Sequence, residues 1–364
     1  MSDLGWNPLH GVPSYPAERY AVLADRIGGI LRSRNDILLV QAEAVVALEA
    51  AAVSVARPGL SALNIVTGPY GGWFGQWLRR GGAAVADIVA EPGLPIEIEA
   101  VAKALDAGPH IDVLALVHAE SASGILNPLP EIVVLARNRG IVTVVDAVAS
   151  VGGHQLDVDD LGIDIAVIGP QKALGGPAGV SALSVSGRAW DLMLSDGAPR
   201  DSILSLADLK TWVDGGRRGL PGTPAPLEFF ALEAALDRIE AEGLENVVAR
   251  HALAASATRA GLSALGAPAW VPAVKASNLV TAVPLPEALA PAALIATAGR
   301  LGIELTEGVG TAPVRLVRLN HTGSRATFQT VLSNVVAYGA ALRKAGQPSD
   351  ISAASEAISA AYSQ

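Results

Sequence analysis

The sequence predicts an α/β protein in which a large domain with a mainly parallel sheet precedes a smaller α+β domain. Between about residues 37 and 190, short β-branched runs alternate with stretches of helical periodicity, as in a parallel sheet covered by helices. Several runs are apolar at every position, which is typical of strands buried on both faces. The pattern changes near residue 240. Since 364 residues exceed what one hydrophobic core usually serves, we expect domains at 1–240 and 241–364.

The predicted elements of the large domain follow one another along the chain. The runs that predict strands are Ser61 to Val66, Ala83 to Val89, Asp112 to Val117, Ile141 to Val145, Asp164 to Ile168 and Val180 to Val185. The stretches that predict helices are Ala42 to Ala56, Tyr70 to Arg80, Glu97 to Ala107, Pro128 to Arg139 and Gly187 to Leu194. A polar connection rich in glycine and arginine, Asp201 to Gly222, then leads into a long helix over Thr223 to Glu242.

The predicted elements of the small domain are helices and strands in alternation. We expect helices over 245–265, 287–300 and 324–344, with strands over 278–283, near 303–306 and over 314–319. The tail from Gly346 onward is rich in alanine and serine and predicts a peripheral helix.

Composition excludes several classes of protein. No apolar stretch approaches the roughly 18–20 residues that span a bilayer, and the N-terminus shows no signal peptide, so we expect a cytoplasmic protein with no membrane partner. The net charge of −9, without a run of Lys or Arg, argues against nucleic acid and favours small-molecule partners. The absence of cysteine excludes disulfides, thiolate metal sites and cysteine nucleophiles. The six histidines lack ligand spacing, so no metal site is expected.

A lysine stands where a buried strand ends. The run Asp164 to Ile168 leads through Gly-Pro-Gln into Lys172, which a glycine-rich turn follows. Small neighbours leave room for a flat ligand, and a desolvated lysine has a neutral amine that can attack a carbonyl group. The alternative is an ordinary surface lysine on a loop.

A carboxylate stands at the end of a neighbouring strand. The run Ile141 to Val145 leads directly into Asp146. Ligands of open α/β sheets bind at this edge, and a carboxylate there could keep a pyridinium nitrogen protonated. The alternative is an aspartate that caps the following turn, which is common.

Together these two segments resemble the class V aminotransferases of fold type I, specifically the alanine–glyoxylate and serine–pyruvate aminotransferase group. The resemblance extends over nearly the whole chain. It covers Ala47 to Ala51, His118 to Gly124, Leu126 to Pro128, Val145 to Gly153, Gln171 to Pro177, Asp208 to Trp212, Thr223 to Pro224 and Val317 to His321.

The resemblance implies a fold-type I enzyme dependent on pyridoxal phosphate (PLP), and it implies roles for particular residues. Lys172 would form the Schiff base with PLP, Asp146 would pair with the pyridinium nitrogen, and Arg318 would bind the substrate's α-carboxylate. Tyr70 would stack on the ring, Val148 would pack on its other face, and Ser121 would contact its 3-oxygen side. Candidate contacts to the rest of the cofactor are Gln171, the amides of Ala44 and Val45 and, from the partner chain of a homodimer, Thr223.

Two positions depart from the family pattern. Glu43 stands in the loop that normally cradles the cofactor phosphate, where a carboxylate would repel that group. A glutamate there resembles the pyridoxamine–pyruvate aminotransferases, which act on the unphosphorylated vitamin. The alternative is a glutamate that faces solvent and is favoured by the helix dipole. Val309 stands where those relatives carry a second arginine.

The activity expected first is therefore transfer of an amino group, through an imine on Lys172, to a small 2-oxo acid such as pyruvate or glyoxylate. The expected alternative is transfer from free pyridoxamine, with unphosphorylated pyridoxal and pyridoxamine in place of PLP. A non-catalytic family member is a third hypothesis, but retention of Lys172, Asp146 and Arg318 argues against it. A dinucleotide-dependent oxidoreductase is disfavoured because no Gly-x-Gly-x-x-Gly turn links an N-terminal strand to a helix.

Overall fold

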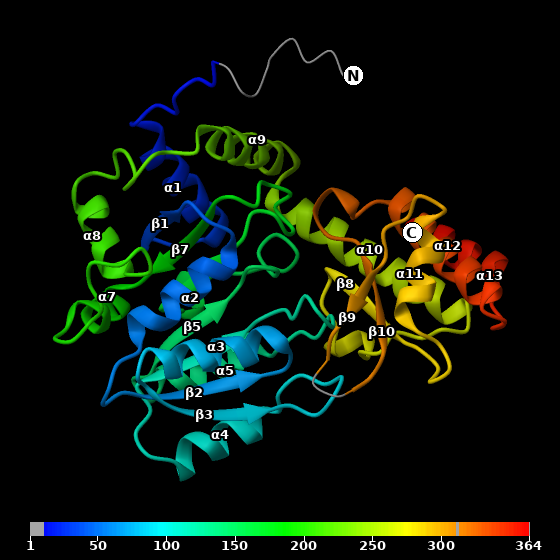
Figure 1. The fold of residues 1–364 in the computed structure, drawn as a ribbon, viewed down its shortest axis with the longest axis horizontal. Helices are drawn as coiled ribbons and strands as arrows, with labels where there is room; N and C mark the ends of the chain where they lie inside the picture. The colour runs from blue at the N-terminus through cyan, green and yellow to red at the C-terminus, as the bar shows by residue number, and fades with distance from the viewer. Residues whose placement is uncertain (1–10, 311–312, 364) are drawn as a thin grey trace.

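A seven-stranded sheet forms the centre of the large part of the molecule in the computed structural model, which describes residues 11–310 and 313–363 (Figure 1). The strand order is β1-β7-β6-β5-β4-β2-β3. Strands β2 to β6 are parallel to one another, while β7 runs antiparallel to both β6 and β1. The strands are β1 (Asp36–Val40), β2 (Ser61–Val66), β3 (Ala84–Val89), β4 (Val113–Val117), β5 (Val142–Asp146), β6 (Ile165–Ile168) and β7 (Ser181–Val185). The predicted α/β fold class is confirmed.

The predicted runs form buried strands with one exception. Strands β4 to β7 are buried at every position, as their continuous apolar sequences require. Strand β3 is instead largely exposed, because it lies at the edge of the sheet and pairs with β2 alone. The opposite edge strand, β1, was not among the predicted strands.

Helices cover the sheet (Figure 1). They are α1 (Arg19–Leu31), α2 (Ala44–Val55), α3 (Pro69–Arg80), α4 (Ile98–Ala107), α5 (Leu129–Arg137), α6 (Val158–Leu161), α7 (Gly187–Leu194), α8 (Leu206–Asp214) and α9 (Pro226–Glu242). Most match the predicted ranges to within a few residues. Helix α8 lies inside the segment that we predicted as a polar connection, where the side chain of Ser205 accepts a hydrogen bond from the backbone N–H of Asp208 and caps the helix. Helix α1 was not predicted.

The C-terminal part contains a three-stranded antiparallel sheet in the order β8-β10-β9. Its strands are β8 (Val280–Pro284), β9 (Thr306–Gly308) and β10 (Leu316–Asn320). Its helices are α10 (Leu244–Ala264), α11 (Pro291–Gly299), α12 (Phe328–Lys344) and α13 (Ile351–Tyr362), with short 3-10 turns at Ala273–Lys275 and Gly323–Arg325. The predicted tail helix is α13.

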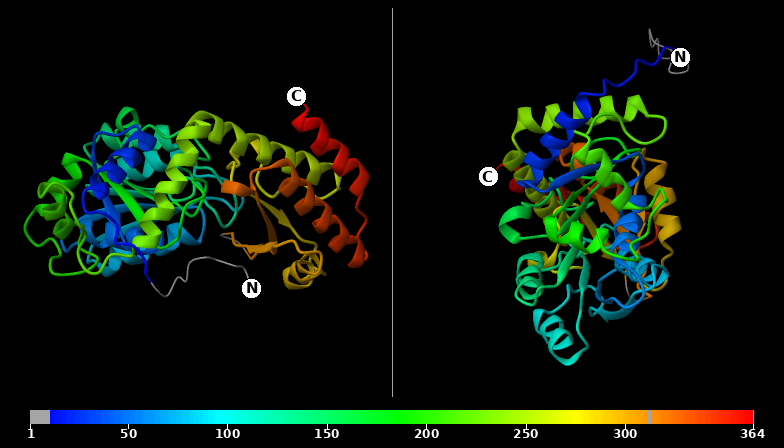
Figure 2. Two further views of the ribbon diagram at one scale, coloured as in Figure 1. Left: turned by 90° about the horizontal axis from the view of Figure 1, so that it is seen from above. Right: turned by 90° about the vertical axis from the view of Figure 1, so that its left-hand side faces the viewer.

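Two main hydrophobic cores lie side by side, one in the blue-to-green part and one in the yellow-to-red part of the ribbon (Figure 2). The last buried residue of the first core is Val247 and the first of the second is Ala254. The change of core therefore falls within α10. We propose that the boundary between the domains lies close to this point, near residue 240.

Candidate active site

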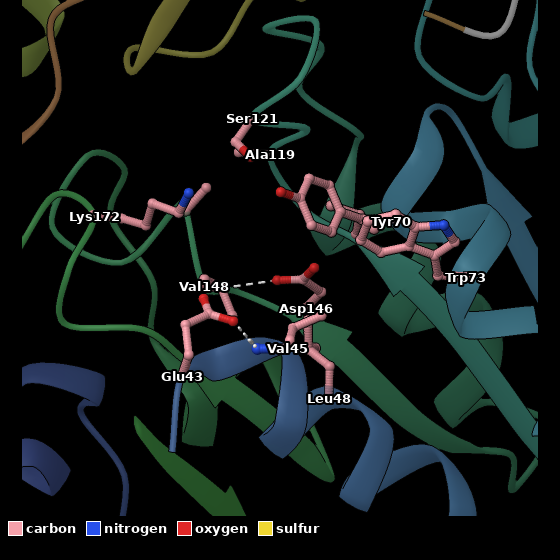
Figure 3. A pocket seen from close by; sticks show the side chains of 12 residues that line it. Glu43, Val45, Leu48, Tyr70, Trp73, Ala119, Ser121, Asp146, Val148 and Lys172 are labelled. Atoms are coloured by element: carbon pink, nitrogen blue, oxygen red, sulfur yellow. Dashed lines mark hydrogen bonds between the residues drawn. The ribbon is translucent and has the colours of Figure 1, made fainter. Parts of the chain in front are cut away.

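A cavity of about 270 Å³ lies at the carboxyl ends of the parallel strands, beside the N-terminus of α2 (Figure 3). Parallel strands bring the residues that follow them to one edge of a sheet, and ligands of open α/β sheets bind there. The cavity is lined by Glu43, Val45, Leu48, Tyr70, Trp73, Val117, Ala119, Ser121, Asp146, Val148, Ala149 and Lys172. Seven of the residues predicted from sequence are in this lining.

Lys172 occupies a tight turn between β6 and β7. Its backbone N–H donates to the carbonyl oxygen of Gly169 at 3.2 Å, and its own carbonyl accepts from Gly175 at 3.1 Å. Burial lowers the pKa of the Lys172 amine, and the nearby charge of Arg318 lowers it further, although neighbouring carboxylates partly offset this. A larger fraction of the amine is therefore neutral and nucleophilic at a given pH.

Asp146 ends β5 and is 5% exposed. One carboxyl oxygen accepts a hydrogen bond from the backbone N–H of Val148 at 2.9 Å. Burial raises the pKa of Asp146 to about 7, while that N–H group and the charge of Lys172 act in the opposite direction. A cationic partner in the cavity would favour the ionised carboxylate, so the site suits a protonated ring nitrogen.

Aromatic side chains form the wall opposite Lys172 (Figure 3). Tyr70 lies at the start of α3, and its ring meets Trp73 edge to face with centroids 5.3 Å apart. Trp73 is half-exposed and was not predicted, although an aromatic residue one helical turn after Tyr70 should share its face. Together with Val148, these rings give the cavity flat apolar walls, which suit an aromatic ligand.

Glu43 turns its carboxylate toward the cavity and caps helix α2 (Figure 3). One carboxylate oxygen accepts from the backbone N–H of Val45 at 2.8 Å. The other accepts from the side-chain amide of Gln171 at 2.6 Å. The backbone N–H of Val45 and the side-chain amide of Gln171, which we predicted to contact the cofactor, thus donate to a carboxylate of the same chain. Ala44 is fully buried and does not line the cavity.

A second chamber of about 330 Å³ adjoins the first and shares Lys172, Ser121 and Ala149 with it. Arg318, from β10 of the small sheet, lines this chamber. Its Nε donates to the hydroxyl of Thr306 at 2.9 Å, and its Nη1 donates to the carbonyl oxygen of Ser121 at 2.5 Å. Arg318, which we predicted to bind a carboxylate, therefore lines the same chamber as Lys172, although it belongs to the C-terminal part of the molecule.

Glu120, to which we assigned no role from the sequence, has a buried carboxyl group. It is fully buried, and neither carboxyl oxygen has a partner of hydrogen-bonding geometry among the described residues. Burial raises its pKa to about 8, and the charge of Asp146 contributes; the nearby N–H of Ala122 lowers it again. A Cβ atom built on Gly68 would lie 2.3 Å from this carboxyl group, so Glu120 packs directly against the turn that precedes Tyr70.

Two positions singled out from the sequence lie away from both cavities. Thr223 is exposed and lines neither. Val309 is 49% exposed and also lines neither; its backbone N–H donates to the carbonyl oxygen of Ala122 at 3.0 Å. Within a single chain, neither of these two side chains therefore lines the site.

Neither metal-binding clusters nor membrane-spanning helices occur within residues 11–310 and 313–363. In these ranges no group of three or more His, Asp or Glu side chains is placed to hold a metal ion. None of the helices there combines the length and the apolar character needed to cross a bilayer.

Comparison with known proteins identifies the family. The family model described as aminotransferase class-V matches residues 33–333. The chain is a class V aminotransferase. The pyridoxamine–pyruvate transaminase of Mesorhizobium japonicum is 36% identical over 333 residues, which cover 90% of this chain and 84% of that protein. The alanine–glyoxylate aminotransferase of Callithrix jacchus is 33% identical over 327 residues, with 86% of this chain and 78% of the relative covered.

Solved structures of class V relatives have the same fold. The pyridoxamine–pyruvate aminotransferase of Mesorhizobium loti superposes with a TM-score of 0.90 at 35% identity, covering 94% of this chain and 88% of that one. The alanine–glyoxylate aminotransferase of Nostoc superposes with a TM-score of 0.84 at 26% identity, covering 91% and 90%. The predicted fold type I and the predicted family are thus confirmed.

Proposed function

We propose that this class V aminotransferase transfers the amino group of free, unphosphorylated pyridoxamine to a 2-oxo acid. The observation that carries the proposal is the position of Glu43, whose carboxylate occupies the N-terminus of α2. Of the two activities expected from sequence, this alternative is the better supported, because pyridoxamine–pyruvate enzymes are among the most similar relatives by both sequence and structure.

The cavity fits the pyridine ring of vitamin B6. Asp146 can pair with the ring nitrogen, the aromatic wall at Tyr70 can stack on the ring, and Lys172 can reach an aldehyde carbon. When bound, such a ring withdraws electrons from the carbon that carries the transferred amino group. These residues are also those that a PLP-dependent relative would need.

The cavity does not fit a phosphate group at the N-terminus of α2. A helix N-terminus binds phosphate through free backbone N–H groups. Here the carboxylate of Glu43 accepts the N–H of Val45 and also the amide of Gln171. A phosphate would have to displace a like charge and take its donors, which is unfavourable.

The residues at the junction of the two cavities have distinct roles in the proposed reaction. Lys172 would hold the aldehyde form as an imine, and its free amine would move a proton between the C4′ carbon of the vitamin and the carbon of the 2-oxo acid that receives the amino group. Asp146 keeps the ring nitrogen protonated. Arg318 binds the carboxylate of the 2-oxo acid without help from the Val309 position.

The active assembly in this proposal is a homodimer. Thr223 precedes α9 and is exposed, so a partner chain could present its copy to this site. Resemblance to the family supports this arrangement.

The test is reductive labelling of Lys172. The protein is incubated separately with pyridoxal and with PLP, reduced with borohydride, and mapped by mass spectrometry, with the exposed Lys103 as the control for non-specific labelling. We expect pyridoxal to label Lys172 preferentially, and pyridoxamine with pyruvate to yield pyridoxal and alanine. Preferential labelling by PLP would instead establish a PLP-dependent enzyme of the alanine–glyoxylate type. Equal labelling of Lys172 and Lys103 would overturn both functions.

A further inference from the structure

The chamber that contains Arg318 is larger and more polar than a pyruvate site requires. Its volume of about 330 Å³ is on the order of ten times the share of a liquid water molecule, roughly 30 Å³. Pyruvate carries only a methyl group beyond its 2-oxo acid unit. The chamber's remaining wall includes the polar side chains of Asn320, Thr322 and Ser324. This inference rests on the proposed function, because it concerns the acceptor of the amino group.

The charge of the chamber is positive. Its described lining includes two arginines, Arg318 and Arg325, and none of the lining residues is an aspartate or glutamate. Behind the wall, Arg238 donates to the carbonyl oxygen of Gly175 at 2.7 Å, and Arg250 donates to that of Gly323 at 2.8 Å. These hydrogen bonds hold the lining residues Gly175 and Gly323 by their carbonyl groups. The two arginines also add positive charge near the chamber, although an ion pair with Glu242 partly neutralises Arg250. The chamber therefore favours anions.

Arg318 can bind one carboxylate in a fixed orientation. A guanidinium group has five N–H donors. One on Nε and one on Nη1 are held by Thr306 and Ser121, which fixes the plane of the group. The other three remain for a ligand, enough for both oxygens of a carboxylate.

Arg325 provides a second positive charge at the edge of the chamber. It belongs to the 3-10 turn Gly323–Arg325 that follows β10. Its Nη2 donates to the carboxylate of Glu304 at 3.0 Å, and the two side chains are 47% and 71% exposed. An exposed pair of this kind contributes about 1 kcal/mol or less, so a substrate carboxylate can replace Glu304.

We propose that the preferred acceptor is a 2-oxo acid with a second carboxylate, and that Arg325 binds this carboxylate and determines the preference. Arg318 holds the carboxylate beside the 2-oxo group. The second carboxylate extends through the polar chamber to Arg325 and exchanges with the side chain of Glu304. A 2-oxo acid with an apolar side chain would leave Arg325 without a ligand and would place that side chain among polar groups.

Binding to the unloaded protein tests the inference independently of any reaction. Succinate and butyrate have the same carbon count and differ by one carboxylate, so calorimetric titration of both isolates the second anionic group. We expect succinate to bind more tightly, and Arg325→Ala to reduce this difference by up to about fivefold. Arg139→Ala is the matched control, because Arg139 pairs with Asp106 on the surface at 2.6 Å and lines neither cavity. Equal affinities for the two acids in the parent protein would overturn the inference.

Turnover provides the second test. Protein carrying pyridoxamine, or pyridoxamine phosphate if only that form is active, is mixed with oxaloacetate, 2-oxoglutarate or pyruvate. The acceptor preference can thus be measured even if the proposed donor is wrong. We expect a dicarboxylic acceptor to have the highest kcat/KM, Arg325→Ala to lower its ratio to pyruvate, and Glu304→Gln to raise that ratio by freeing Arg325. A preference for pyruvate that neither variant changes would refute the assignment.

Discussion

Replacing Glu43 with glutamine removes one negative charge from the cavity and preserves the length of the side chain. Two unit charges about 4 Å apart repel by about 1 kcal/mol in bulk water and by about 4 kcal/mol at an effective dielectric constant of about 20. Because Glu43 is exposed, we take about 2 kcal/mol per unit of charge. A phosphate monoester carries about 1.5 to 2 negative charges, so the carboxylate should disfavour PLP by about 3–4 kcal/mol. The variant should therefore gain roughly two to three powers of ten in affinity for PLP relative to pyridoxal.

The assay is an absorbance titration of the parent and variant proteins with pyridoxal and with PLP. Glu49→Gln serves as the matched control, because Glu49 lies on the same helix, pairs with Arg80 at 2.6 Å and lines neither cavity. The ratio of the two Kd values should change only in Glu43→Gln. If both variants show the ratio of the parent protein, the carboxylate does not select the unphosphorylated vitamin, and the reasoning fails.

Three further predictions concern the lysine, the packing near the aromatic wall and acid stability. Lys172→Ala should abolish turnover without changing the circular dichroism spectrum or lowering Tm; normal activity would refute its role. Gly68→Ala should lower the free energy of unfolding by about 1–3 kcal/mol, because its Cβ would meet the buried Glu120, whereas Gly72→Ala, with nothing within 4 Å, should be neutral or stabilising in urea unfolding. Burial lowers the pKa of His118 to about 3. Below about pH 6.5 the unfolded state therefore binds more protons than the folded state, so folding becomes less favourable as the pH falls. The free energy of unfolding should then fall between pH 6.5 and 4, and His118→Gln should make this fall smaller; an identical pH dependence would contradict the assignment.

Local sequence was sufficient to predict the elements that follow a strong periodicity. The continuous apolar runs of β4 to β7 are buried strands because both faces of the sheet are covered there. Strand β1 was missed because it is short and its place depends on antiparallel pairing with β7, which is distant in the chain. Helix α8 was missed because its segment is polar, although Ser205 supplies a capping signal.

Long-range packing decided which polar side chains belong to the site. Glu43 could have faced solvent, but an amide 128 residues away holds its carboxylate at the helix N-terminus. Nothing in the local sequence indicated that Glu120 is buried, and in the structure it packs against the turn at Gly68, 52 positions earlier in the chain. The direction of a flexible side chain is set by its partners, and distant segments supply those partners.

The sequence by itself determined that Lys172 and Asp146 would meet, because Asp146 ends one buried strand, Lys172 follows another, and neighbouring parallel strands end at one edge of a sheet. The sequence also indicated the family, through motifs that match it in order along most of the chain. Only the tertiary structure decided that Arg318 reaches the carbonyl of Ser121, 197 residues away, and that a positively charged chamber separates it from Arg325. No periodicity encodes these contacts, because they depend on where the C-terminal part of the chain lies relative to the large sheet.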